Sequence, residues 1–245
     1  MTIIIIFFVL HWYLSLCSQT LFLHRYASHG YYHLSPLGEK IGHILTWITQ
    51  GSSYLSPYAY GILHKAHHSY SDTEKDPHSP HFHSDPITMM WETAKTYSQV
   101  EKREHPFCKT FAPHVKQWQW FDNLASSWLS RLFFGTLYFL VYFYFAPHWS
   151  VFLLLPVHFM MGPLHGFIVN WFGHWAGYRN ADTPDKSKNT LPVDLFLMGE
   201  LYQNNHHANP NDPCFAKKWW EVDPGYVVLC MFKQRGFKPH SSQVN

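Results

Sequence analysis

Three apolar stretches constrain what this chain can fold into, because each approaches the length that crosses a bilayer. They cover about residues 2–23, 132–145 and 151–171, and a transmembrane helix needs about 20 mostly apolar residues. Inside a bilayer the backbone must satisfy its own hydrogen bonds, which predicts that these stretches are helical. A fourth stretch, 41–63, is half apolar and predicts a buried or interfacial helix pair. The expected fold is an all-α membrane protein with about three to four transmembrane helices.

The positions of lysine and arginine predict how these spans are oriented. All 18 lie between Arg25 and Arg131 or from Arg179 onward, and such residues are in excess in cytosolic loops. We therefore expect one domain, 1–245, in which 24–131 and 174–245 form a cytosolic cap. The first stretch lacks a basic leader and runs into a histidine and an arginine, so it predicts a retained span rather than a cleaved signal peptide.

Histidine is the anomaly in the composition. Its 20 copies outnumber lysine and arginine together, whereas charged residues make up only 14% of the chain, below the quarter typical of soluble domains. The net charge of +2 does not indicate a nucleic-acid partner. The four cysteines are far apart and form no CxxC pair, so we expect neither a disulfide framework nor a zinc ribbon.

Histidines in the predicted cap fall into short motifs. His24 and His29 form an HxxxxH pair at the end of the first span. On a helix, spacings of three and four place side chains on one face, where they can converge on a metal. The other motifs have this spacing: His64, His67 and His68 in HxxHH, Asn170 and His174 at the end of the last span, and Gln203, His206 and His207 in QxxHH.

Eight motif histidines are too many for one centre, so the pattern predicts two metals. Imidazole suits zinc, copper, iron and nickel, and structural zinc favours cysteine, which these motifs lack. Iron is therefore preferred. Carboxylates are expected to orient the imidazoles, and the candidates are Asp72, Glu74, Asp76, Asp194 and Glu200. We interpret His11, His33, His43, His148, His158 and His165 as structural, and His78, His81 and His83 as outer-shell or solvent residues.

In these motifs the chain resembles the membrane fatty acid desaturases, especially the delta-nine type that acts on acyl-CoA or acyl-lipid. The segments FLHRYASH, HKAHHSYSDTEKDPHSP, VNWFGHWAGYR and GELYQNNHHANP carry the resemblance in family order, over about residues 11–238. The last family motif usually begins with histidine, whereas this chain has Gln203, whose amide oxygen is a weaker ligand. The resemblance implies a di-iron site with these ligands: His24, His29, His64, His67, His68, His174, His206, His207, with Asn170 reaching iron through water.

The resemblance implies oxygen-dependent desaturation of a long-chain fatty acyl group. This reaction breaks C–H bonds that no side-chain base can deprotonate. Molecular oxygen is then a co-substrate. The chain carries no haem-domain, flavin or ferredoxin signature, so we expect a separate electron donor: ferredoxin, rubredoxin, or a small haem protein with its reductase. Membrane lipid is a further partner, and Lys217-Lys218-Trp219-Trp220 is interpreted as a membrane-surface anchor. A bacterial inner membrane is favoured over the endoplasmic reticulum.

Three other functions fit the same motifs. A lipid hydroxylase or ketolase could use the same scaffold, because the histidine motifs alone separate it poorly from a desaturase. A membrane metal transporter or haem carrier would instead need polar residues in the middle of its spans. A non-catalytic membrane metal-binding protein is the third alternative, suggested by Gln203.

Overall fold

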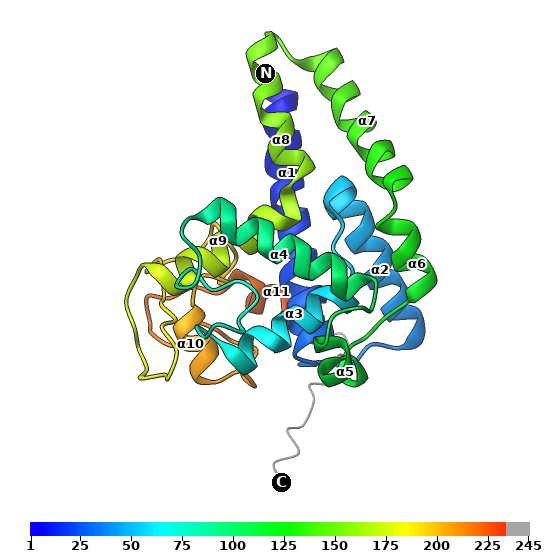
Figure 1. Ribbon diagram of the computed structural model, residues 1–245. Helices are drawn as coiled ribbons and strands as arrows, with labels where there is room; N and C mark the ends of the chain where they lie inside the picture. The colour runs from blue at the N-terminus through cyan, green and yellow to red at the C-terminus, as the bar shows by residue number, and fades with distance from the viewer. Residues whose placement is uncertain (234–245) are drawn as a thin grey trace.

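The structure is a computed structural model that describes residues 1–233 (Figure 1). Within these residues every regular element is a helix, and the strand-like pairings are isolated bridges, two of which join Asn189 to Tyr178 and to Tyr202. The all-α prediction is therefore confirmed. The last part of the predicted cap, residues 234–245, lies outside the described residues.

The chain begins with its longest helix. Helix α1 (Thr2–Ser18) continues as the π-helix η1 (Gln19–Ser28), and together they form a span of 27 residues. Three short 3-10 turns, η2 (Gly51–Ser53), η3 (Ala112–His114) and η4 (Trp149–Leu154), join later helices. The remaining helices are α2 (Pro36–Gln50), α3 (Pro57–Tyr70), α4 (Pro86–Glu101), α5 (Phe107–Phe111), α6 (Gln119–Ala125), α7 (Trp128–Phe145), α8 (Leu155–Phe159), α9 (Met161–Trp175), α10 (Gln203–Ala208) and α11 (Pro224–Lys233).

Local sequence determines where several helices of the cap begin. Ser35, Ser56 and Asp85 each accept a hydrogen bond from a backbone N–H of the first turn of α2, α3 and α4. A proline follows each cap, and proline suits the first helical position because its missing N–H would have no partner there. The half-apolar stretch 41–63 accordingly contains parts of two helices, α2 and α3, joined by η2.

Two helices are long and apolar enough to cross a membrane, and a third candidate is bent. The first two are residues 2–28 and α7, and the third joins 149–159 to α9 with a bend of 70°. The stretch expected at 151–171 is thus two helices that meet at Met160. Pro163 cannot continue a preceding helix, and the N–H of Gly162 donates to Ser53 Oγ at 3.0 Å instead.

The spanning helices carry apolar side chains outward and polar side chains inward. Helix α1 exposes Val9 and Leu10 but buries His11 and Ser15. Helix α2 likewise exposes a stripe of large aliphatic residues and buries polar ones, the reverse of a soluble amphipathic helix. An apolar outer surface of this kind is compatible with a lipid surrounding. The outward residues of α2 are Leu37, Ile41, Leu45 and Ile48, and its buried residues are His43, Thr46 and Gln50.

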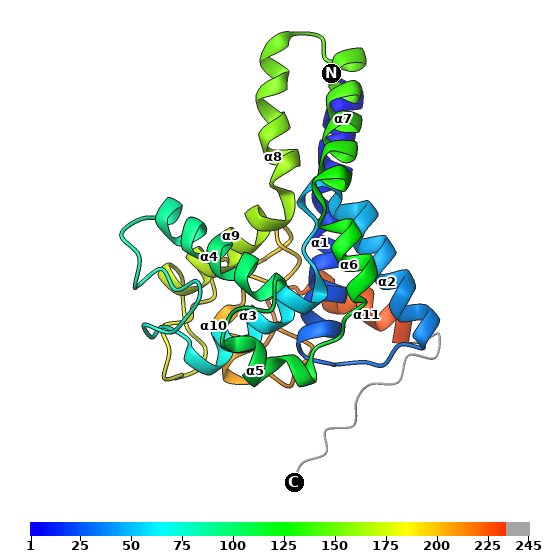
Figure 2. The same ribbon diagram turned by 45° about the vertical axis from the view of Figure 1, so that its right-hand side comes forward.

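The arrangement in space separates the spans from the cap (Figure 1). Helices α1, α7 and α8 extend away from a compact group that contains α3, α4, α5 and α10, and both views agree on this (Figure 2). The N-terminus and the connection from α7 to α8 lie at the far end. All helices that carry the motif histidines therefore converge at the opposite end.

This arrangement predicts that Ser150 and Ser84 lie on opposite sides of the membrane. Both are exposed, Ser150 beyond α7 and Ser84 before α4. In intact cells, a membrane-impermeant thiol reagent should label Ser150→Cys and should reach Ser84→Cys only after permeabilisation. The unsubstituted protein, whose four cysteines are all partly buried, is the background control. Labelling of both variants in intact cells would contradict this topology.

Candidate metal centre

Five of the predicted histidines converge on one point. His24 comes from η1 and His29 directly follows it, His64 and His68 come from α3, and His206 comes from α10. Four of them, all except His68, can hold one metal by the spacing of their ligand atoms. The Nε2–Nε2 distances are 2.6 Å for His29–His64, 3.2 Å for His24–His206, 3.0 Å for His64–His68 and 2.9 Å for His68–His206.

Two of these distances, 3.0 and 3.2 Å, are those of nitrogens that share a metal ion, and the other two are shorter. Two imidazole nitrogens at about 2.1 Å from one ion, at octahedral or tetrahedral angles, lie roughly 3.0–3.4 Å apart. Burial, and then the neighbouring histidines, hold the pKa of His64, His68 and His206 well below its usual value. The rings are therefore neutral at pH 7, which is the form that binds metal.

The π-helix explains how the first pair of histidines can share a metal. His29 follows His24 by five residues, and its N–H bonds to the carbonyl of His24 at 3.1 Å. In an α-helix, residues five apart point in different directions, whereas a π-helix turns once in about that interval. The HxxxxH spacing thus requires the wider turn of η1.

Three more histidines form a second group. His67 on α3, His174 on α9 and His207 on α10 bring their ligand atoms within 4.8 Å of one another. The Nε2 atom of each is buried and has no hydrogen-bond partner within residues 1–233. A buried polar atom without a partner is costly, so three such atoms facing one another fit a transition metal. The second group passes this test, whereas in the first group the Nε2 atoms contact one another.

Carboxylates leave the Nε2 atoms of the second group available. Asp76 accepts from His67 Nδ1 at 3.0 Å, and Asp72 accepts from His174 Nδ1 at 2.8 Å. A proton fixed on Nδ1 directs the lone pair of Nε2 toward the metal. Asp72 also accepts from the backbone N–H of Lys186 at 2.7 Å, which connects the loop after α3 to the loop after α9. Burial alone would raise the pKa of Asp72, but its hydrogen bonds lower that pKa to about 2.

The carboxylate predictions were only partly right. Glu200 behaves as expected, because it accepts from His24 Nδ1 at 2.6 Å. Asp194 instead accepts backbone N–H groups of residues 197, 199 and 201, and Glu74 is exposed. The sequence analysis missed Asp185, which accepts from His207 Nδ1 at 2.6 Å. Asp185 lies in a loop 22 residues before its partner, and no spacing pattern indicates it.

A buried ion network holds the Glu200 carboxylate in place. The Arg25 guanidinium is fully buried and donates to Glu200 at 2.9 Å and to both oxygens of Asp223 at 3.0 and 2.9 Å. Thr20 donates to Glu200 as well. Because Asp223 immediately precedes α11, this network connects the end of the described chain to the first histidine group.

Gln203 and Asn170 lie close to the histidine groups. Gln203 is buried at the start of α10, packs against Gly173 on α9, and donates from Nε2 to the carbonyl of Glu200 at 2.8 Å. This bond leaves its amide oxygen as the atom for a metal. Asn170 lies one helical turn before His174 and lines a cavity with His24.

The remaining histidines have other surroundings. His78 is buried beside His67 and lines the cavity, and its ligand atoms group with His67 and Asp76 rather than with the second group. His81 donates to the carbonyl of His174 at 3.0 Å, which is an outer-shell contact. His11 and His158 are hydrogen-bonded to each other at 2.6 Å between the spanning helices, far along the chain from the motifs.

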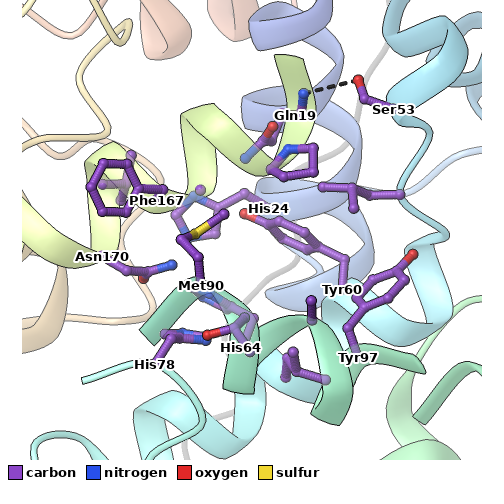
Figure 3. A pocket seen from close by; sticks show the side chains of 18 of the residues that line it. Gln19, His24, Ser53, Tyr60, His64, His78, Met90, Tyr97, Phe167 and Asn170 are labelled. Atoms are coloured by element: carbon purple, nitrogen blue, oxygen red, sulfur yellow. Dashed lines mark hydrogen bonds between the residues drawn. The ribbon is translucent and has the colours of Figure 1, made fainter. Parts of the chain in front are cut away.

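A mostly apolar cavity of about 220 Å³ lies against the first group, through His24 and His64, and is also lined by Gln203 and Asn170. Helices α3, α4 and α9 and the π-helix η1 supply its walls. Figure 3 shows His24, His64, His78 and Asn170 along one part of the cavity, with Phe167 and Met90 beside them. Such a space can hold an apolar chain next to bound metals.

Comparisons with known proteins agree with this arrangement. The family model described as "Fatty acid desaturase" matches residues 1–223. A hex-5-enoyl-[acyl-carrier protein] acetylenase of Moorena producens (strain JHB) is 26% identical over 92% of this chain and 72% of its own length. The delta-9 desaturase-like 5 protein of Arabidopsis thaliana is 27% identical over 94% of this chain and 73% of its own length. Delta-9 acyl-lipid desaturase 2 of Arabidopsis thaliana is 26% identical over 72% and 55%. The family match covers both histidine groups.

Removing the charge of Asp185 should weaken metal binding at the second group. Asp185→Asn leaves His207 without its carboxylate, and loss of such a partner typically costs 10–100-fold in metal affinity. Metal content per chain after dialysis against graded chelator measures this. Asp182→Asn is the matched control, because Asp182 lies in the same loop but is fully exposed. Equal metal retention by the two variants would contradict the role of Asp185.

Proposed function

We propose, from the premise that this chain belongs to the fatty acid desaturase family, that it is a di-iron oxidoreductase that desaturates a long-chain fatty acyl group with molecular oxygen. One observation carries the proposal: two groups of buried imidazoles each face inward on a point, and the first group borders an apolar cavity through His24 and His64. Bound iron would supply the oxygen and one-electron chemistry that no side chain can.

The ligands follow from the two groups. His24, His29, His64, His68 and His206 would hold one iron. His67, His174 and His207 would hold the other, with Gln203 and a water on Asn170 as weaker partners. Nitrogen-rich sites of this kind suit iron among the available metals. Iron, rather than structural zinc, is also supported by the absence of cysteine from both groups.

The protein's own contribution is to bind the acyl chain of the substrate and to position it. The cavity excludes water from the acyl carbons, and its narrow walls restrict which carbons come beside the imidazoles, which is the positioning part of catalysis. The side chains of Leu55, Leu63 and Met89 supply apolar wall. Carboxylates on Nδ1 keep His67 and His174 in the tautomer that points toward the metals.

The substrate is a fatty acyl group, and the delta-nine position is favoured by the motif resemblance. The printed names of similar proteins include an acyl-carrier-protein acetylenase and an acyl-lipid desaturase, so acyl-lipid, acyl-CoA and acyl-carrier protein are the carriers to compare. Electrons would come from a separate ferredoxin, rubredoxin or small haem protein. The metal centre would face the cytosol, most simply that of a bacterium.

A lipid profile tests the function. Cells that express the protein with a suitable electron donor should accumulate a fatty acid lighter than its precursor by two hydrogen atoms, as measured by mass spectrometry. A product heavier by one oxygen atom would instead indicate a hydroxylase on the same scaffold. His207→Ala should abolish the product without loss of membrane insertion, whereas His148→Ala, at the exposed α7–α8 connection, should not. Product from His207→Ala would contradict its ligand role.

Gln203 can be tested separately by its effect on iron. Gln203→Ala removes a potential oxygen ligand, so iron should dissociate faster in chelator, whereas Gln203→His should retain iron at least as well because imidazole binds it more strongly. Iron content of the purified variants measures this. Identical iron retention in Gln203→Ala and the unsubstituted protein would exclude Gln203 as a ligand.

A further inference from the structure

The cavity contains one cation that the proposed iron site does not use. Arg131, in the first turn of α7, is the only lysine or arginine that lines it. Its Nε donates to the carbonyl of Ser126 at 3.1 Å, and its Nη1 donates to the carbonyl of Ser52 at 2.9 Å. Within residues 1–233, Nη2 has no hydrogen-bond acceptor, and no carboxylate lies within ion-pair distance of the guanidinium.

Arg131 has no ion-pair partner within residues 1–233, and the nearby Glu101 instead accepts from Tyr97 Oη and Ser126 Oγ. Glu200 is the one carboxylate among the lining residues, and it is already bonded to Arg25 and His24. A guanidinium beside an apolar space is stabilised by an oxygen acceptor, and its planar donors match a carboxylate well. The two carbonyl contacts fix the orientation of Arg131, so its free nitrogen is already positioned for a ligand.

The chain connects Arg131 to the histidines through η2 and α3. Its partner Ser52 lies in η2, five residues before α3 begins at Pro57, and Leu55 and His64 both line the cavity. Arg131 and the first histidine group therefore border the same cavity from different elements.

An acyl chain with its oxygen-bearing end at Arg131 would extend along this cavity toward His24 and His64. Figure 3 shows Ser53 and Tyr97 across the cavity from Asn170 and His78. The end of the cavity at Ser53 is therefore distinct from the end at Asn170. The polar groups at the Ser53 end and the apolar walls between fit a molecule with one oxygen-bearing end.

We propose that Arg131 binds the carbonyl end of the acyl substrate and thereby determines which carbons lie beside the first histidine group. The acceptor is either the carboxylate of a fatty acid or the carbonyl oxygen of its ester or thioester. This inference rests on the proposed function, since it assigns a specificity-determining residue to that reaction.

Ligand binding tests the assignment without turnover. Purified full-length protein in detergent is equilibrated with radiolabelled palmitic acid, and unlabelled palmitic acid, methyl palmitate and hexadecanol compete. Palmitic acid should bind at least about tenfold more tightly than hexadecanol, the difference expected for one charged hydrogen bond. Methyl palmitate separates the two sources of the acceptor: tight binding indicates carbonyl recognition, and weak binding indicates recognition of the carboxylate.

Arg131→Gln should weaken palmitic acid binding about tenfold and leave hexadecanol binding unchanged, and unchanged hexadecanol binding also shows that the cavity is intact. Lys95→Gln, a half-exposed cation on α4 paired with Glu92, is the matched control and should change neither. Equal affinity of the unsubstituted protein for palmitic acid, methyl palmitate and hexadecanol would overturn the proposal, even if Arg131→Gln failed to fold. If binding depends on Arg131 but the protein yields no desaturated lipid, the proposed function is refuted. The proposed binding of the carbonyl end by Arg131 is then still supported.

Discussion

The structure depends on imidazole nitrogens that face one another across about 3 Å. Neutral rings in this position gain nothing from each other unless one donates a proton, and the three Nε2 atoms of His67, His174 and His207 have no partner. Only a shared cation makes such a group favourable. The elements that carry these rings must therefore be held together by other forces, and buried carboxylates provide them. Each of Asp72, Asp76, Asp185 and Glu200 binds one imidazole from another segment.

The candidate spanning helices also carry or adjoin histidines of both groups. The first candidate span passes without a break from α1 into η1, so the helix that exposes apolar side chains also carries His24 and ends directly before His29. The last candidate span ends at α9 with His174. Bending this span at Met160 brings Gly162 against Ser53, which closes one wall of the cavity. A membrane-embedded bend, the cavity and the histidine groups are thus consequences of the same packing.

The sequence could predict the parts that depend on periodicity. Motif spacing named the eight histidines that the fold brings into these two groups, and in the HxxHH and QxxHH motifs residues on one helical face remain neighbours whatever the fold. Asp185 could not be found this way, since it lies in an irregular loop and meets His207 only through tertiary folding. Asp194 was misassigned for the opposite reason: it is near a motif in sequence, yet its oxygens are taken up by backbone N–H groups. The bend at Met160 was missed because hydropathy averages over a break that Pro163 causes.

The two histidine groups differ in a way that bears on their chemistry. Five imidazoles surround the first point and three surround the second, where Gln203 stands at the position at which the family usually has histidine. A metal with fewer strong ligands has more open positions. The second group also has Asn170 nearby, one turn before His174 on α9. Exchangeable ligands would then collect at the second metal, while the first would be enclosed. Its His24 and His64 still line the cavity, as do Gln203 and Asn170, so an acyl chain in the cavity would lie against the first group and against these two amide side chains. Its position along the cavity would then decide which carbons react.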